Sequence, residues 1–332
     1  MPQGSILGPL LYSIYTNVLS EVIHEHEGTA SFSAPFNLPC DSCGGICSFA
    51  DDSTLTISSF NPDELGPLLM NRYNSISDYM LGNRLALNND KTHFMVIASQ
   101  NQHRQNNNFG ITLNTGTEIV SPSESERILG LNVQKDLSWN THILDGENSL
   151  SRNLSRKINA LRKICTEADF RTRKTLADGL VMSNIVYMIQ VYGQASDYLL
   201  RILQVQQNRA ARAVTRLAWG TSTHHLLNQI GWLSVRQLYV YHSLLLLWKI
   251  RISGQPKYLN GKFVQNFSYS TRQATGNCLS VYRTPRTELS KKFFIYNFTV
   301  LWNTLPTKLK ELQSLPAFKR ELRNWVKDNV ET

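Results

Sequence analysis

The chain has 332 residues, of which 42% are apolar and 18% charged, and its formal net charge is +9 at pH 7. This apolar content is enough to build a core, in one large domain or two. No apolar stretch approaches the roughly 18 residues of a membrane span, and no basic segment precedes the first apolar run as in a signal peptide. We therefore expect an intracellular protein without a membrane partner, either nuclear or cytoplasmic.

The charge is unevenly distributed along the chain. Residues 1–150 contain 6 lysines and arginines against 16 aspartates and glutamates, a net charge of −10. Residues 151–332 contain 28 against 9, a net charge of +19. An acidic half followed by a basic half indicates a cation site and then a surface for polyanions. Solvated basic helices are the alternative, but we favour nucleic-acid contact.

Turn residues in PQGSILGP predict a loop and a helix start before the apolar run LLYSIYTNVL. A loop rich in Gly, Ser, Pro and Cys follows over residues 28–47. Within it, Cys40, Cys43 and Cys47 form C-x2-C-x3-C. Three thiols are one ligand short of the usual zinc site, and the spacing is not that of a standard finger. Metal binding here is a remote alternative to semi-buried thiols.

The stretch CSFADDSTLTIS, residues 47–58, predicts a β-hairpin, because strand-forming residues flank two aspartates. Asp51 and Asp52 lie at its tip, where adjacent carboxylates must be solvated, paired or metal-bound. The following segment, NPDELGPLLMNRYNSISDYMLGN, predicts a helix with an Asn-Pro-Asp start and apolar residues at helical spacing.

Short elements are predicted next. Asn88–Lys91 is read as a turn, Thr92–Ala98 as a strand and residues 100–110 as an exposed loop rich in Asn and Gln. A strand pair is expected around Ile111–Val120. The segment ERILGLNVQKDLSW then predicts strand, turn and strand.

From about residue 145 the pattern is helical. Apolar residues at steps of three and four predict a helix, and a second is expected over Tyr198–Leu217. A shorter helix, a break at Gly231 and a long apolar helix follow, then a polar linker or loop over residues 254–288 and a C-terminal helical segment. The apolar positions of the first helix are Leu150, Leu154, Ile158, Leu161 and Ile164. Trp302, Phe318 and Trp325 are expected in the core rather than as base-stacking platforms.

Four motifs occur in order within about 140 residues: PQGSILGPLLYSIYTN, FADD, LALNNDKTHFMV and LGLNVQKDLSW. This series resembles the palm of non-LTR retrotransposon reverse transcriptases. Two later segments, QVQQNRAARAVTRL and VLWNTLPTKLKELQSLPAFKRELR, resemble the region after the polymerase core. The resemblance implies an α+β fold with a partial palm of antiparallel strands and helices. Its expected divisions are residues 1–145 (partial palm), 146–253 (basic thumb-like helices), 254–288 (linker) and 289–332 (C-terminal helices).

The resemblance implies RNA-directed DNA polymerase activity, with an RNA template and a DNA primer as partners. Nucleotide addition uses two Mg²⁺ ions, which take oxygen ligands. Asp51 and Asp52 match the paired aspartates of the family, with Asp51 favoured as the direct ligand. Lys91 matches a lysine that could neutralise or protonate the leaving pyrophosphate, although it could equally be a surface lysine.

Other positions are carried over from the family in the same way. Pro2, Gln3, Gly4 and Ser5 match a loop near the incoming nucleotide and template. Phe49 and Ala50 are expected to anchor the hairpin and leave space beside the nucleotide. Leu129, Gly130 and Leu131 fall at the primer grip, or are only strand core. The basic residues expected at the nucleic-acid backbone, unless they are simply solvated, are Arg152, Arg156, Lys157, Arg209, Arg212 and Arg216, of which the last three share a helix face.

The family uses a third metal-binding aspartate, on a strand before the PQG motif, whereas this sequence begins one residue before Pro2. Asp41 and Asp63 follow the PQG motif in the chain, so neither replaces an aspartate that precedes it. Two carboxylates compensate two magnesium ions poorly, so we expect these 332 residues alone to be inactive. The sequence leaves open whether an upstream exon supplies the aspartate. It also leaves open a non-enzymatic nucleic-acid-binding remnant that uses the basic half, and a decayed reading frame.

Overall fold

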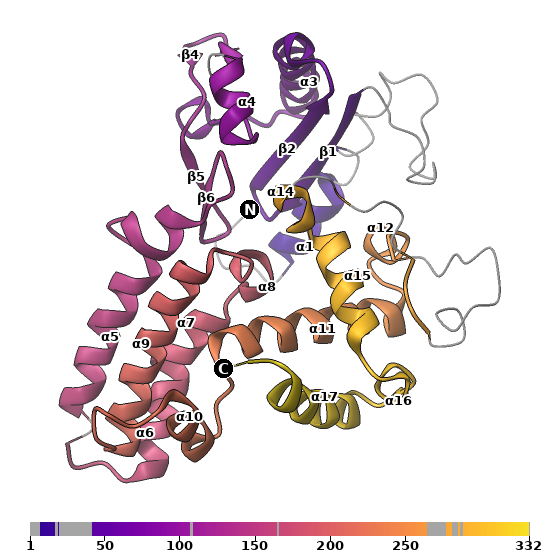
Figure 1. Ribbon diagram of the computed structural model, residues 1–332. Helices are drawn as coiled ribbons and strands as arrows, with labels where there is room; N and C mark the ends of the chain where they lie inside the picture. The colour runs from indigo at the N-terminus through magenta and orange to yellow at the C-terminus, as the bar shows by residue number, and fades with distance from the viewer. Residues whose placement is uncertain are drawn as a thin grey trace. The chain divides into compact units, whose positions relative to one another are not determined.

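The computed structural model describes residues 7–16, 19, 42–106, 109–164, 166–263, 277–280, 285 and 288–331. The chain divides into two compact units, an N-terminal unit of residues 1–127 and a helical unit of residues 128–332 (Figure 1). Small antiparallel sheets of two strands occur early and a mainly helical region follows, which confirms the predicted α+β class. The division predicted at residue 145 rests on family motifs, whereas the boundary after residue 127 separates compact units. The division at residue 145 therefore stays a prediction.

The N-terminal unit contains two short strand pairs and one long helix. Its elements are α1 (Gly8–Tyr15), β1 (Ser42–Phe49), β2 (Asp52–Ser59), α3 (Pro62–Gly82), the 3-10 turn η1 (Asn89–Lys91), α4 (Gln100–Gln105), β3 (Leu113–Asn114), β4 (Ile119–Val120) and most of β5 (Ser125–Ile128). Helix α3 begins as predicted, since the Asn61 side chain accepts a hydrogen bond from the Asp63 amide at 3.1 Å. Its buried Ile76 and Met80 pack with Leu55 of β2.

Three predictions for this unit are wrong. Residues 42–47, the end of the predicted loop 28–47, belong to strand β1, because they pair with β2. Residues 100–105 form helix α4 rather than a loop, because Ser99 and Gln102 make a reciprocal capping box. The signal was present as Ser-x-x-Gln, but the Asn and Gln content obscured it. Thr92–Ala98 is not assigned as a strand. The Ser123 amide donates to the Phe94 carbonyl oxygen at 2.9 Å, but no ladder forms among the described residues.

The helical unit begins with the strand that completes the β5–β6 hairpin. Its elements are β6 (Leu131–Gln134), the π-helix η3 (Thr141–Asp145), α5 (Leu150–Ile164), α6 (Phe170–Ala177), the π-helix η4 (Asp178–Met182), α7 (Ser183–Val186), α8 (Ile189–Tyr192), α9 (Asp197–Thr215), α10 (Thr223–Ile230), α11 (Val235–Ser253), α12 (Lys257–Asn260), α14 (Glu288–Lys291), α15 (Phe294–Thr304), α16 (Thr307–Lys310) and α17 (Leu315–Asn329). The predicted helices near 150, 198, 223 and 235 are thus confirmed. Gly231 (φ +73°) ends α10 in the left-handed region.

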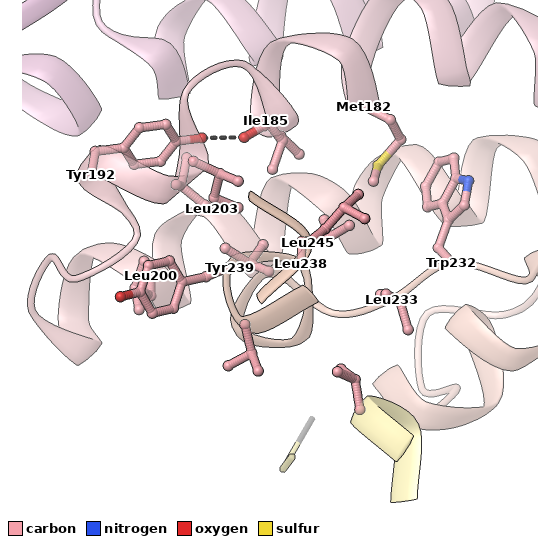
Figure 2. Close-up of a cluster of buried hydrophobic side chains, with 14 of the residues drawn as sticks. Met182, Ile185, Tyr192, Leu200, Leu203, Trp232, Leu233, Leu238, Tyr239 and Leu245 are labelled. Carbon is pink, nitrogen blue, oxygen red and sulfur yellow. Dashed lines mark hydrogen bonds between the residues drawn. The ribbon is translucent and has the colours of Figure 1, made fainter. Parts of the chain in front are cut away.

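The helical unit has one large apolar core. Leu154, Ile158 and Leu161 of α5 are fully buried, whereas Ile164, the last apolar position of the predicted series, is 57% exposed. Side chains from η4, α7, α8, α9 and α11 interdigitate in Figure 2. There the Tyr192 hydroxyl donates a hydrogen bond to the Ile185 carbonyl oxygen, and burial raises the pKa of Tyr192.

The C-terminal helices also pack into this core. Trp302 and Phe318 are buried, and the Phe318 ring stacks on Trp248 of α11 at a centroid distance of 5.0 Å. Trp325 is partly buried against the same cluster, so the predicted core role of these aromatic residues is confirmed. Within the predicted linker 254–288, Lys257–Asn260 form α12, and the side chains of Phe263 and Leu279 are buried in the core. None of the helices within the described ranges is long and apolar enough to span a membrane.

We expect the helical unit to lose stability in mild acid through His242 of α11. Burial, with smaller contributions from Lys249 and Lys319, lowers the pKa of His242 below its usual 6.5. The unfolded chain therefore takes up a proton below pH 6.5 before the native chain does. The stabilisation is present above pH 6.5 and is lost as the pH falls toward the native pKa. Urea midpoints at roughly pH 7.5 and 5.5 measure it, with His242→Gln flattening the dependence and exposed His225→Gln leaving it intact.

Candidate metal centre and nucleic-acid surface

The FADD segment forms the tip of the β1–β2 hairpin. The strands pair from Ser42 with Ser59 to Phe49 with Asp52, so Ala50 and Asp51 form a two-residue turn. Ala50 has a φ of +54°, which two-residue hairpin turns require. Since threonine and apolar residues flank the turn, both strands suit a half-buried sheet. The predicted hairpin with both aspartates at its tip is confirmed.

Asp51 and Asp52 are both exposed. No hydrogen bond or ion pair joins either carboxylate to another described residue, so their oxygens are available to a hard cation. The described part of the chain gathers no group of three or more His, Cys, Asp or Glu residues that could hold a metal ion. The aspartates thus have the donor chemistry that Mg²⁺ prefers and, among described residues, form only part of a ligand set.

The other residues expected near the nucleotide are placed as follows. Phe49 is 65% exposed beside the turn, so the hairpin is anchored through Ile46 and Leu55 instead. Lys91 ends η1 with an exposed side chain. The 3-10 turn around it is held by the Asn89 side chain, which contacts the Tyr73 hydroxyl and the Thr117 hydroxyl at 3.2 and 3.1 Å. Pro2, Gln3, Gly4 and Ser5 lie outside the described residues.

The expected primer-grip residues form the turn of the β5–β6 hairpin. Leu129 and Gly130 have φ values of +46° and +85°, the signs of a type I′ turn. The Tyr187 hydroxyl donates to the Leu129 carbonyl oxygen at 2.8 Å, and its ring lies 3.5 Å from the position of a Cβ on Gly130. Leu131 is buried in the core. Tyr187 was missed in the sequence because it lies 58 residues away.

The basic residues predicted on α5 differ in their surroundings. Arg152 and Arg156 are exposed and one turn apart on the same face. Lys157 is half-buried, and its Nζ donates to Asn184 Oδ1 at 2.8 Å. The opposite face of α5 packs on α9. Arg152 and Arg156 are therefore free to contact a polyanion, whereas Lys157 contributes to packing.

The arginines predicted on α9 make contacts within the unit. Arg209 donates to Ser155 Oγ and Gln206 Oε1 at 3.2 and 2.8 Å. The Arg212 guanidinium carbon lies 4.8 Å from the centre of the Trp219 ring. Arg216 is the left-handed C-cap residue (φ +60°) and donates to the Thr166 carbonyl oxygen at 2.6 Å. The helix ends before Arg216, so the prediction that all three share one helix face is wrong for it.

The cysteine cluster is described in part. Cys47 is an exposed free thiol on β1. The side chain of Cys43 and the whole of Cys40 lie outside the described residues. Zinc binding there stays a prediction.

A family model matches the N-terminal part of the chain. The model described as Reverse transcriptase (RNA-dependent DNA polymerase) matches residues 1–133, which include the FADD hairpin and the Leu129–Gly130 turn. These residues are therefore a reverse transcriptase domain.

Three curated relatives are similar to the chain over about two thirds of its length. The probable RNA-directed DNA polymerase from transposon BS of Drosophila melanogaster is 25% identical over 252 residues, covering 69% of this chain and 24% of that protein. The RNA-directed DNA polymerase from mobile element jockey of Drosophila funebris is 22% identical over 226 residues, covering 68% and 23%. The probable RNA-directed DNA polymerase from transposon X-element of Drosophila melanogaster is 22% identical over 227 residues, covering 66% and 22%.

The chain is a distant homologue of the RNA-directed DNA polymerases of non-LTR retrotransposons. It spans about a quarter of the length of these relatives. No solved structure matches it at a significant level.

Proposed function

We propose that the chain is the later palm and the following helical region of a non-LTR RNA-directed DNA polymerase. The observation that carries this is the pair of exposed, unpaired carboxylates on the two-residue FADD turn, inside the segment that matches reverse transcriptases. Its substrates are an RNA template, a DNA primer and deoxynucleoside triphosphates. The basic helical unit holds the nucleic acid by its phosphates.

The donor chemistry of Asp51 and Asp52 fits Mg²⁺, so these residues would hold it, with Asp51 as the direct ligand. Bound Mg²⁺ supplies charge stabilisation for the attacking and leaving oxygens of phosphoryl transfer. The short turn limits the freedom of both carboxylates. Lys91, on its short 3-10 turn, is proposed to neutralise or protonate the pyrophosphate. The primer end rests on the Leu129–Gly130 turn, which Tyr187 holds in place.

Metal binding by the hairpin gives the direct test. We expect the full chain to bind Mn²⁺, followed by electron paramagnetic resonance, and Asp51→Asn/Asp52→Asn to weaken it about tenfold or more, since both carboxylates are lost. The control Asp78→Asn removes one exposed carboxylate from α3 of the same unit and should leave the affinity unchanged. Equal Mn²⁺ affinity in the wild type and the double variant would contradict the assignment.

Polymerase activity is a separate question, because the paired aspartates are two of three expected ligands. We expect the 332-residue polypeptide by itself to give no Mg²⁺-dependent extension of a DNA primer on an RNA template. Steady synthesis that Asp51→Ala abolishes would overturn this expectation. It would mean that these residues complete the ligand set in a way the sequence does not indicate.

A non-enzymatic role in binding nucleic acid is the second candidate. It is favoured by one observation, the exposed and unpaired Arg152 and Arg156 in a region of net charge +19. Binding that depends steeply on salt, without any response to Asp51→Asn/Asp52→Asn, would support this candidate.

A further inference from the structure

Trp219, in the loop between α9 and α10, is unlike the other tryptophans of the chain. Its side chain is 75% exposed. Trp139, Trp232, Trp248 and Trp302 are at most 8% exposed, and Trp325 is partly buried. An exposed indole leaves a large apolar surface in water without contributing to the core. Its position therefore points to contact with something other than the core.

The indole is held in a defined orientation by the end of α9. The Arg212 guanidinium carbon lies 4.8 Å from the ring centre, and Arg212 Nη2 donates to the Thr221 carbonyl oxygen at 3.4 Å. The Thr221 amide in turn donates to the Ala218 carbonyl oxygen at 3.1 Å, which closes the loop around Trp219. Asn208 Nδ2 ties α9 to Thr223 Oγ1 at 2.7 Å, where α10 begins. The ring is thus presented on a short, braced turn.

The segment of sequence that contains Trp219 is basic, and the residues of its loop are small rather than apolar. Residues 198–287 contain 12 lysines and arginines and no aspartate or glutamate. In the loop itself, Ala218, Gly220 and Ser222 are small and exposed. An apolar protein partner would call for a contiguous apolar patch, which these residues do not form. The combination of an isolated aromatic ring and a basic segment suits a polyanion that also carries flat rings.

We propose that Trp219 is a stacking platform for an unpaired base of a single-stranded nucleic acid. The cationic Arg212 lies against the indole, and the strand's phosphates lie along the basic C-terminal end of α9. Stacking needs an accessible base face, which a duplex hides inside its stack, so the site selects single strands with little dependence on sequence. The proposal rests on nucleic-acid binding by the helical unit and adds a site to it.

The test uses the full chain, a fluorescein-labelled oligo(dT) and a labelled duplex, followed by anisotropy. Trp219→Ala should weaken oligo(dT) binding about 5- to 150-fold, the range of one lost base stack. It should leave duplex binding unchanged, and it should leave the salt dependence of oligo(dT) binding unchanged because no phosphate contact is removed. Trp219→Phe, which keeps an aromatic face, should retain most of the affinity.

Tyr198→Ala is the matched control, since it removes a 64% exposed aromatic ring from the other end of α9. It should not change oligo(dT) binding. Unchanged oligo(dT) affinity in Trp219→Ala, or equal weakening for oligo(dT) and duplex, overturns the stacking site while leaving nucleic-acid binding by the helical unit intact. Failure of the wild-type chain to bind either nucleic acid overturns both. Urea midpoints check that each variant is folded.

Discussion

Gly193→Ala is expected to lower the free energy of unfolding of the helical unit by about 3 kcal/mol. Gly193 follows α8, where a Cβ atom would overlap the Tyr239 ring and lie 2.5 Å from the Ile189 carbonyl oxygen. Neither neighbouring group can move aside without a large cost in free energy. The Ile189 oxygen belongs to the backbone, and Tyr239 is buried with its hydroxyl donating to Asn297 Oδ1 at 2.8 Å. The cost is steric overpacking rather than loss of a contact.

Urea denaturation of the full chain, followed by circular dichroism, measures this effect. The control is Gly179→Ala in η4, where a Cβ would meet no atom within 4 Å. That substitution should be neutral or slightly stabilising, because alanine restricts the unfolded chain more than glycine does. Equal urea midpoints for the two variants would mean that α8 and α11 pack less closely than in this structure.

Charge reversal at Arg152→Glu/Arg156→Glu is expected to weaken nucleic-acid binding by about 50-fold or more at roughly 0.1 M salt. Both guanidinium groups are exposed, one turn apart, and free of hydrogen bonds or ion pairs with described residues. Each lost phosphate contact should also lower the slope of log K against log salt by about 0.9. The expected signature is therefore a weaker complex with a slope reduced by about two.

The control reverses two exposed lysines on α17, Lys319→Glu/Lys327→Glu, and so makes the same change in net charge. We expect a much smaller loss of affinity and an unchanged slope. If both double variants weaken binding equally, the interaction depends on the overall charge of the helical unit and not on a defined face of α5. Titrations of a labelled RNA–DNA hybrid at several salt concentrations separate the two outcomes.

Local patterns determined much of the fold. The FADD hairpin was predictable because strand formers flank a turn, and a two-residue turn sets the register of both strands. Helix α5 was predictable because its apolar residues recur every three or four positions. The Asn-Pro start of α3 and the glycine after α10 mark helix ends for reasons of backbone geometry. These signals act within a few residues of one another, so one sequence contains them completely.

The motif order likewise indicated a reverse transcriptase, and the match over residues 1–133 bears this out. The roles of the individual site residues remain proposals. Pro2, Gln3, Gly4 and Ser5 lie outside the described residues.

Only the tertiary structure decided which polar side chains remain exposed and available to bind a ligand. Arg152 and Arg209 look alike in sequence, yet the first is exposed while the second donates hydrogen bonds to Ser155 and Gln206. Lys310 is only 5% exposed and donates to Cys278 Sγ at 3.3 Å, although its segment reads as a basic helix surface. Tyr187 supports a turn 58 residues away. A side chain's surroundings come from distant segments packed against it, and the periodicity of its own helix does not contain them.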